Sequence, residues 1–493
     1  MKKPIKLLMS AGLLTMAVGA LSGCGDNFKG LTINFWNTFG STVLGGVQTA
    51  ANNFAKLIKE QEGVDLRIKL TYKGGYDDLK GEIEKNLAIG DNPTIAVAYP
   101  DHIADYFSAE KLAGQTFVVN LQPFIDDEEI GFGKESFLGD KPTAVMDDFQ
   151  PAYVEEATSF PKEGTYVLPF MKSTELMLYN IELLKKAKPF VSYNWDTDDD
   201  IKETMADISW DDFMDLCEEI KNHMSEISTD LMWPLYYDSD ANLMISHMMQ
   251  NEIPYSYVEK GYGVIGFDAS PLNKNPTDEQ KQAYLDVQAA LRKYKAWHDD
   301  GLFETKGVRG EYGSKYFTAG NCIFTVGSSG GSGYSFPATT TKMVPVAVKT
   351  PYANDNPLYV SQGISLALFN NKKLIASGKN DQAVKYGWKF IKYLTNPELN
   401  ADLCANHSEG YVPARKSALS TTTYINFLKT KSAYAEVAKT VINGINGRYF
   451  NTAVFQGSPT LRDQMAAIFA DVMKGKDLKT TLDKGISEAN GKM

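Results

Sequence analysis

Residues 166–179 read YVLPFMKSTELMLY, and we interpret them as two apolar strand segments that meet at Pro169–Lys172. The chain before them alternates between runs with strand-like and helix-like periodicity. Strands are predicted at Leu31–Trp36, Val64–Tyr72 and Pro93–Tyr99, and a helix is predicted over Ala51–Gln61 between the first two. Such alternation is typical of an α/β fold with a sheet rich in parallel strands.

The length and charge of the chain limit the architecture and the partners. A single hydrophobic core stops growing at about 250–300 residues, and this chain has 493 residues, so two lobes are expected. The formal net charge is -11. That balance argues against nucleic acid as a partner and against charge-driven binding to anionic lipid.

The first residues have the pattern of a secretory signal. A basic start (Lys2, Lys3 and Lys6) precedes an apolar run that is shorter than the ~20 residues of a membrane span. The following Leu21–Cys24 resembles the cleavage site of bacterial lipoproteins, in which the cysteine carries the lipid. We therefore predict a lipoprotein signal peptide over residues 1–23, a tether over 24–30 and a lipid anchor at Cys24. An ordinary secreted protein is the alternative.

The remaining cysteines and the histidines indicate neither disulfides nor a metal centre. Cys217 and Cys322 fall in apolar patterns and are predicted to be buried, and the five histidines lie far apart. Asp196, Asp198 and Asp200 match the first positions of a calcium loop. The turn glycine of that loop is missing, however, which favours a solvated loop. We predict no metal and no cofactor.

A glycine-rich segment offers a second class of function. Gly327–Gly331 formally matches G-x-S-x-G, the motif that carries the nucleophilic serine of α/β hydrolases, with Ser329 as the nucleophile. Asp381 and His407 follow in the order of a triad. No clear helix pattern follows the motif, so a loop that binds a polar ligand through backbone N–H groups and hydroxyls is favoured. A surface hydrolase is the alternative.

Aromatic side chains at loops and element ends favour a polyol ligand. Aromatic rings stack on the C–H faces of sugars while neighbouring polar groups bind the hydroxyls. Taken singly, each such aromatic is expected to be a core residue more often than a ligand contact, because aromatic side chains dominate cores. The set comprises Trp36, Tyr76, Trp233, Tyr236, Tyr237, Tyr411 and Phe455.

Four stretches, in this order, carry a family resemblance: residues 169–180 (PFMKSTELMLYN) with 183–187, then 317–322 (FTAGNC), 390–398 (FIKYLTNPE) and 410–415 (GYVPAR). They resemble the family 1 extracellular solute-binding proteins of ABC importers. The resemblance implies a two-lobed fold with a ligand cleft, no catalytic residue and no enzymatic activity. It implies a monomer that captures a small molecule at the outer face of the cell membrane and delivers it to permease subunits.

Residues 35–36 and 71–76 are similar to the glycerol-3-phosphate-binding type of that family. This resemblance implies ligand contacts at Tyr76, Asp101, Ser173, Ser328, Gly363 and Tyr411. That type holds the phosphate with an arginine near residues 452–457, where this chain has Phe455. Because an aromatic ring cannot pair with a dianion, a neutral sugar or oligosaccharide is predicted. Phe455 would stack on it, with Trp233 or Tyr237 opposite. A glycerol-3-phosphate or glycerophosphodiester ligand held by Arg448 is the alternative.

The chain is expected to cross between the lobes near residues 172, 331 and 368. On this basis lobe 1 comprises residues 31–172 and 332–368, and lobe 2 comprises residues 173–331 and 369–493.

Overall fold

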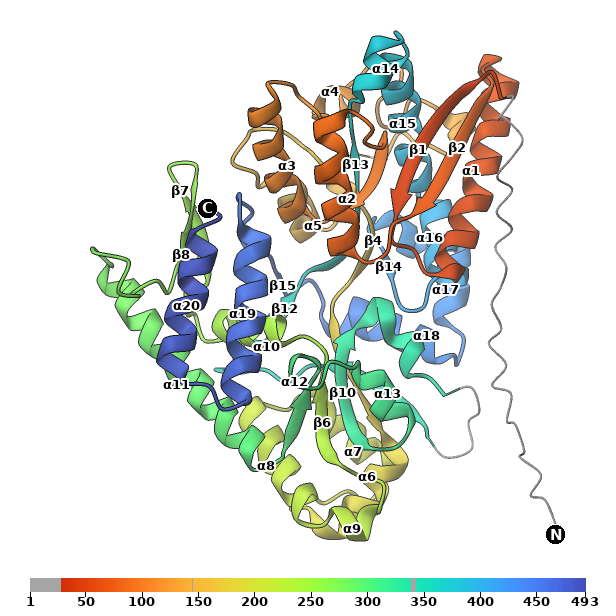
Figure 1. Ribbon diagram of the computed structural model, residues 1–493. Helices are drawn as coiled ribbons and strands as arrows, with labels where there is room; N and C mark the ends of the chain where they lie inside the picture. The colour runs from red at the N-terminus through yellow and green to blue at the C-terminus, as the bar shows by residue number, and fades with distance from the viewer. Residues whose placement is uncertain (1–27, 144, 338–342) are drawn as a thin grey trace, which may run out of the picture.

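The computed structural model describes residues 28–143, 145–337 and 343–493. It forms two lobes, each built on one mixed β-sheet that helices cover (Figure 1). The first sheet has six strands in the order β14-β4-β13-β3-β1-β2, and the second has five in the order β11-β5-β10-β6-β9. Strands β1, β2 and β3 are parallel, as are β6, β9 and β10. The predicted α/β fold with two lobes is confirmed.

Lobe 1 is built mainly from the first third of the chain and a later return segment. Its strands are β1 (Leu31–Asn37), β2 (Leu66–Tyr72), β3 (Ile95–Ala98), β4 (Leu168–Ser173), β13 (Gln362–Leu368) and β14 (Val412–Pro413). Its helices are α1 (Ser41–Glu62), α2 (Tyr76–Ile89), α3 (Pro100–Ala113), α4 (Gln122–Ile125), α5 (Pro151–Thr158), α14 (Lys372–Ala376), α15 (Asn380–Leu394), α16 (Pro397–Asn406) and α17 (Thr422–Leu428).

Lobe 2 contains the middle of the chain and its C-terminal helices. Its sheet comprises β5 (Glu175–Asn180), β6 (Trp233–Tyr237), β9 (Phe303–Thr305), β10 (Cys322–Ser328) and β11 (Pro345–Lys349), and β7 (Ser256–Glu259) with β8 (Tyr262–Ile265) forms a separate hairpin. Its helices are α6 (Ile181–Ala187), α7 (Asp198–Ala206), α8 (Trp210–Asn222), α9 (Met224–Ile227), α10 (Asp240–Gln250), α11 (Asp278–Asp299), α12 (Lys306–Arg309), α13 (Gly313–Thr318), α18 (Ala433–Lys439), α19 (Ser458–Met473) and α20 (Leu478–Asn490).

Residues 166–179 do contain two strands, β4 and β5, and every residue of both is buried. The strands meet at Thr174 and not at Pro169–Lys172, which lies within β4. They belong to different sheets, so the chain crosses between the lobes at Thr174. The carbonyl of Thr174 accepts from the backbone N–H of Ser329 at 2.7 Å, and its hydroxyl donates to the carbonyl of Val360 at 2.7 Å. These bonds tie the first crossing to the glycine-rich segment of lobe 2 and to the short β12 (Tyr359–Val360), which pairs with β15 (Tyr449–Phe450).

The later lobe boundaries differ from those expected at residues 331 and 368. Strand β11 continues the second sheet by pairing antiparallel with β5, although it was expected in lobe 1. Helices α15 and α16 were expected in lobe 2, yet they pack into the lobe 1 core through residues such as Trp388, Phe390 and Leu403. An apolar strand or helix face packs equally well on either sheet, so its sequence pattern does not select the lobe.

Several local predictions can be compared with the structure. Cys217 and Cys322 are buried and free, as predicted. Asp198 and Asp200 lie in the first turn of α7, where Asp200 completes a capping box with Thr197 and Asp198 pairs with Lys185 at 2.9 Å. Across the described ranges, no grouping of side chains suited to a metal ion is found. No helix within those ranges is long and apolar enough to cross a membrane. The predicted signal peptide and Cys24 lie outside the described residues.

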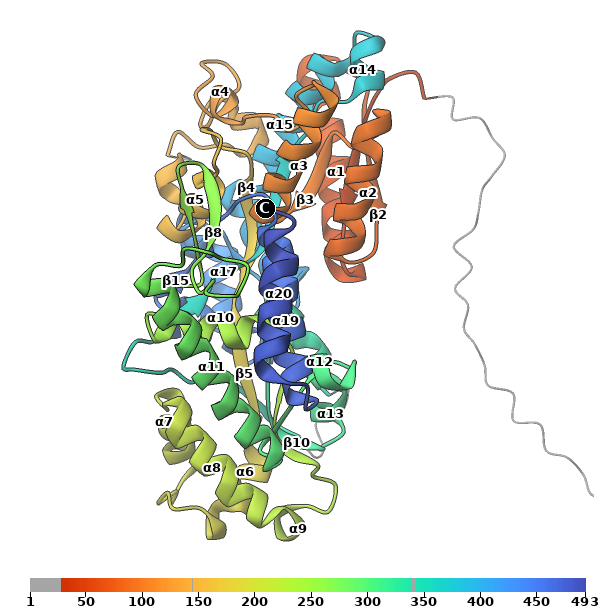
Figure 2. The same ribbon diagram turned by 60° about the vertical axis from the view of Figure 1, so that its left-hand side comes forward.

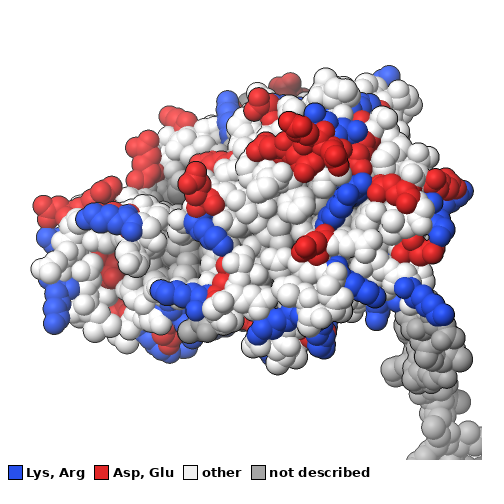
Figure 3. Space-filling model, turned by 90° about the horizontal axis from the view of Figure 1, so that it is seen from above, with Lys and Arg blue, Asp and Glu red and all other residues white. Residues whose placement is uncertain are grey.

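The charges on the upper face are unevenly spread. Figure 3 shows one large group of acidic side chains together with several smaller ones, while Lys and Arg lie between and around them. This distribution agrees with the net charge of -11.

Candidate ligand-binding site

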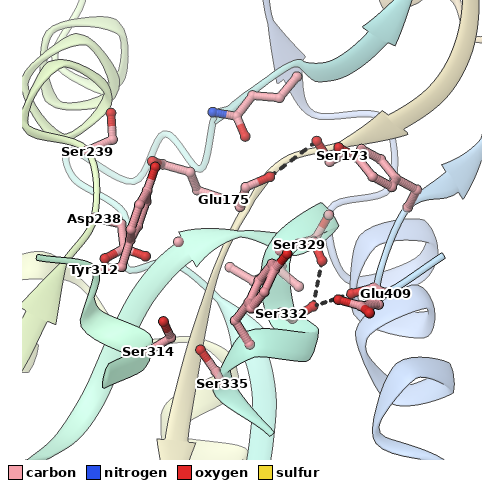
Figure 4. Close-up of a pocket in the computed structure, with 18 of the residues that line it drawn as sticks. Ser173, Glu175, Asp238, Ser239, Tyr312, Ser314, Ser329, Ser332, Ser335 and Glu409 are labelled. Carbon is pink, nitrogen blue, oxygen red and sulfur yellow. Dashed lines mark hydrogen bonds between the residues drawn. The ribbon is translucent and has the colours of Figure 1, made fainter. Parts of the chain in front are cut away.

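A cavity of about 720 Å³ lies between the lobes, where the chain crosses from one sheet to the other (Figure 4). The parallel strands β6 and β10 end at the same edge of their sheet, so the residues that follow them meet there. Lobe 1 contributes Thr38, Gly40–Val43, Tyr76, Tyr99, Ser173, Gln362, Glu409 and Tyr411. Lobe 2 contributes Glu175, Leu176, Leu178, Asp238, Ser239, Asn242, Lys306, Tyr312, Ser314, Thr325, Gly327–Ser332, Tyr334 and Ser335.

Five tyrosines line this cavity from both lobes, including Tyr411. Tyr76 and Tyr99 stack on each other with ring centroids 4.3 Å apart. Tyr312 and Tyr334 on the lobe 2 side are 58% and 70% exposed. Large aromatic side chains left this exposed inside a cavity are available to contact a ligand.

Glu175 is the most deeply buried carboxyl group in the cavity wall. Its two oxygens accept from the hydroxyl of Tyr237 at 2.6 Å and from the amide of Asn242 at 3.0 Å. Burial disfavours the charged form and raises the pKa of Glu175 to about 7, even though both donors act in the opposite direction. Tyr237 therefore positions the Glu175 carboxyl group through this hydrogen bond but does not itself line the cavity.

The other charged groups are Asp238, Glu409 and Lys306. Burial raises the pKa of Asp238 to about 6, although one of its oxygens accepts from the N–H of Gly313 at 2.6 Å. The ammonium of Lys306 lies 3.7 Å from the ring centre of Tyr312. The cavity wall thus carries three carboxyl groups and one lysine, which disfavours an anionic ligand and provides acceptors for hydroxyl groups.

The glycine-rich segment after β10 folds as a short 3-10 helix over Ser329–Ser335. The hydroxyl of Ser332 donates to the carbonyl of Glu409 at 3.2 Å, which joins this segment to the chain leading to β14. Ser329 is fully buried, and its hydroxyl oxygen accepts from the N–H of Thr174 at 3.3 Å. Asp381 and His407 do not line the cavity. The G-x-S-x-G match therefore lacks the exposed serine and the partners that a nucleophile needs.

The structure brings four of the predicted contact residues into the cavity: Tyr76, Ser173, Ser328 and Tyr411. The hydroxyl of Ser328 lies 3.4 Å from that of Ser173, so the two serines meet across the first crossing. Asp101 instead lines an adjoining cavity of about 240 Å³, where it pairs with Arg462.

The other predicted residues do not line the main cavity. Gly363 lies in β13 with φ near 110°, where an added Cβ would come within 2.5 Å of the Met171 carbonyl. Trp36 is buried beneath Lys73, whose ammonium lies 3.9 Å from the centre of the indole ring. Trp233 is buried beneath the guanidinium of Arg309.

Phe455, which was predicted to stack on the ligand, belongs to the lobe 2 core. It is 1% exposed, and its ring lies so close over Gly263 that a Cβ there would come within 2.1 Å. Arg448 is exposed and lines none of the three cavities described here. Neither residue lines the main cavity, because Phe455 packs in the lobe 2 core and Arg448 lies on the surface just before β15.

Sequence reasoning missed Glu175, Asp238, Tyr312, Tyr334 and Glu409. The sequence pattern around Glu175 could have identified it as a site residue, because an acidic residue in an otherwise apolar strand requires a partner or a ligand. Tyr334 had a weaker one, as the aromatic residue within the glycine-rich segment. Nothing local distinguishes Asp238 or Tyr312 from ordinary surface residues.

Comparisons with known proteins place this fold. The chain matches the family described as bacterial extracellular solute-binding protein over residues 50–435. The GacH receptor of Streptomyces glaucescens is 14% identical with a TM-score of 0.62, covering 92% of this chain and 97% of that chain. UgpB of Mycobacterium tuberculosis is 17% identical with a TM-score of 0.64, covering 94% and 98% respectively. MalE3 of T. maritima is 13% identical with a TM-score of 0.64, covering 94% and 100%. A comparison with curated protein sequences found no match.

The family match spans most of the chain, and the matching structures share its fold. The cavity between its lobes is lined by tyrosine rings, hydroxyl groups and carboxyl groups, and neither Asp381 nor His407 is among its described lining residues. Because the match covers residues 50–435, this chain belongs to the bacterial extracellular solute-binding protein family.

Proposed function

We propose that this protein captures a neutral sugar or oligosaccharide outside the cell and delivers it to the permease subunits of an ABC importer. The observation that carries the proposal is the pairing of tyrosine rings with hydroxyl and carboxyl groups in one cavity between the lobes. Rings stack on the apolar faces of a sugar, and carboxylates accept hydrogen bonds from its hydroxyls. Solved neighbours support it: GacH was determined with acarbose and MalE3 with maltose.

A glycerophosphodiester is the second candidate, since UgpB was determined with glycerophosphocholine. The three carboxyl groups and the exposed tyrosines would suit a choline cation. The phosphate would have only Lys306 among the charged residues of the cavity wall. This imbalance favours the neutral sugar.

Binding and release make or break no bond, so we propose no catalytic residue and no cofactor. We further propose that the protein acts as a monomer and that a lipid on Cys24 holds it at the outer face of the membrane. The signal-like residues before Cys24 motivate the anchor. A Cys24→Ser variant that stayed fully membrane-bound after signal processing would contradict it.

The test of the binding function uses Tyr334, because its side chain is 70% exposed and contributes little to stability. A sugar at a hundred times its dissociation constant should raise the free energy of unfolding by about 2.7 kcal/mol in the parent. Tyr334→Ala should weaken sugar binding by about ten-fold, which is about 1.4 kcal/mol. The matched control is Tyr72→Ala, because Tyr72 lies on β2, is 60% exposed and lines none of the three cavities. Unchanged sugar affinity in Tyr334→Ala would remove this residue from the site.

A further inference from the structure

A second groove of about 450 Å³ lies between α5 of lobe 1 and the β7–β8 hairpin of lobe 2. Figure 2 shows the hairpin standing beside α5. The ring of Phe160, just after α5, and the ring of Tyr257 in β7 both line this groove. Polar groups of Glu156, Ser159 and Asn451 line it as well.

This back groove adjoins the main cavity through the 240 Å³ cavity. The small cavity and the main one share residues of both lobes, namely Tyr99, Ser239, Asn242 and Gln362. The small cavity and the back groove share Glu156, Asn451, Thr452 and Val454. The three spaces therefore follow one another along the boundary between the lobes.

The back groove has the same chemistry as the main cavity, namely aromatic rings beside hydrogen-bonding groups. Tyr257 is 38% exposed, so its ring has a free face. Glu156 accepts from the ammonium of Lys172 at 2.6 Å and from the hydroxyl of Ser361 at 3.2 Å. Glu155 accepts from the amide of Asn451 at 3.0 Å. The carboxyl groups here are held by partners, which leaves a polar surface suited to hydroxyl groups rather than to an ion.

We infer that the ligand is a linear oligosaccharide whose far end leaves the main cavity through the small one and lies in the back groove against Phe160 and Tyr257. The inference rests on the proposed sugar-binding function and specifies the length of the ligand. A sugar confined to the main cavity would gain no affinity from the back groove. A longer oligosaccharide would bury additional sugar rings against Phe160 and Tyr257.

The experiment measures dissociation constants by calorimetry for linear maltooligosaccharides and cellooligosaccharides, from the disaccharides to the heptasaccharides. In the parent, the longer sugars of whichever of the two series binds should bind at least about ten-fold more tightly than the disaccharide of that series. This difference corresponds to about 1.4 kcal/mol of binding free energy. Tyr257→Ala should abolish most of that gain and leave the disaccharide affinity unchanged. Tyr257→Phe, which keeps the ring, should retain the gain.

Tyr262→Ala is the matched control, because Tyr262 lies on the same hairpin, is 75% exposed and lines none of the three cavities. Circular dichroism confirms folding of each variant. Affinity independent of chain length, or an equal loss for short and long sugars in Tyr257→Ala, would overturn the inference while leaving the proposed function intact. Binding of glycerophosphocholine with no binding by any neutral sugar would instead overturn the proposed function itself.

Discussion

At the scale of single residues, Glu175 combines deep burial with a place in the cavity wall. Both of its oxygens accept hydrogen bonds from neutral donors, and no Lys or Arg within the described part of the chain pairs with it. The sequence placed it in an apolar strand, but its partners come from β6 and α10, which local patterns do not connect to β5. Ser173, Ser328, Tyr76 and Tyr411 were predictable because they lie at element ends within motifs. The position of Phe455 could not be predicted, because an aromatic residue in a loop has the same sequence pattern whether it faces a cavity or a core.

Glu175 should make stability depend on pH. The pKa of Glu175 rises from 4.5 to about 7 on folding, because burial disfavours its charge. Between these two pKa values, the folded state binds more protons at Glu175 than the unfolded state does. The contribution of Glu175 to the free energy of unfolding is therefore present below about pH 4.5 and is lost as the pH rises through about 7. We expect Glu175→Gln to raise the free energy of unfolding at about pH 8 by about 1–3 kcal/mol and to flatten the pH dependence.

Urea unfolding at about pH 5 and about pH 8 measures this difference. Glu488→Gln, which removes a half-exposed carboxylate on α20, is the control and should behave as the parent. An unchanged pH dependence in Glu175→Gln would show that another group is responsible.

Phe455 should behave as a core residue and not as a ligand contact. Its burial against Gly263 predicts that Phe455→Ala lowers the free energy of unfolding by about 3–5 kcal/mol. The affinity of the fraction that remains folded should change little for any ligand. Calorimetry on the folded variant checks this, and a selective loss of sugar affinity with unchanged stability would return Phe455 to the site.

At the scale of elements, strands β1, β2 and β3 and the helix between the first two followed from local patterns, whereas the assignment of later elements to lobes did not. The capping residues Ser209 and Asn396 begin α8 and α16, where local hydrogen bonds decide the start of a helix. Strand β11 and helix α15 pack according to long-range contacts that periodicity does not encode. Helices α3 and α19, distant in sequence, are joined near the boundary by the Asp101–Arg462 pair. The N–H of Gly457 also donates to Asp105 at 2.8 Å.

The Asp101–Arg462 pair should stabilise the packing of α3 on α19. Burial is the largest single influence and raises the pKa of Asp101, but the charges of Arg462 and His102 and the hydrogen bonds from both residues together outweigh it, so the pKa lies below its ordinary value of 3.8. The pair therefore stabilises the folded protein fully at pH values above 3.8, the ordinary pKa of an aspartate. This stabilisation is lost as the pH falls through the lowered pKa that Asp101 has in the folded protein. Asp101→Asn should cost about 1–3 kcal/mol, less than for a fully buried pair because Arg462 is 33% exposed.

Chemical unfolding at about pH 7 and at about pH 3 tests this expectation. Asp299→Asn breaks the exposed pair with Lys295 and should cost less than about 1 kcal/mol. Equal costs for the two variants would mean that the pair between α3 and α19 is no stronger than a surface contact.

At the scale of the whole molecule, two lobes surround a cavity that draws its wall from both. Three segments between the lobes meet around Thr174 and the β12–β15 pair, an arrangement suited to hinge closure on a ligand. The number of lobes was predictable from chain length, because one core cannot organise so many residues. The path of the chain between the two lobes was not predictable from the sequence, because it depends on which sheet each later element joins.

The central claim is that the cavity between the lobes binds a neutral sugar. The most direct measurement is a calorimetric titration of the purified protein, and of Tyr334→Ala, with neutral mono- and oligosaccharides and with glycerophosphocholine and glycerol 3-phosphate. We expect saturable one-site binding of at least one neutral sugar, weakened by about ten-fold or more in Tyr334→Ala, and no binding of glycerol 3-phosphate. Tight binding of a phosphate-bearing ligand, with no heat from any neutral sugar, would contradict the account.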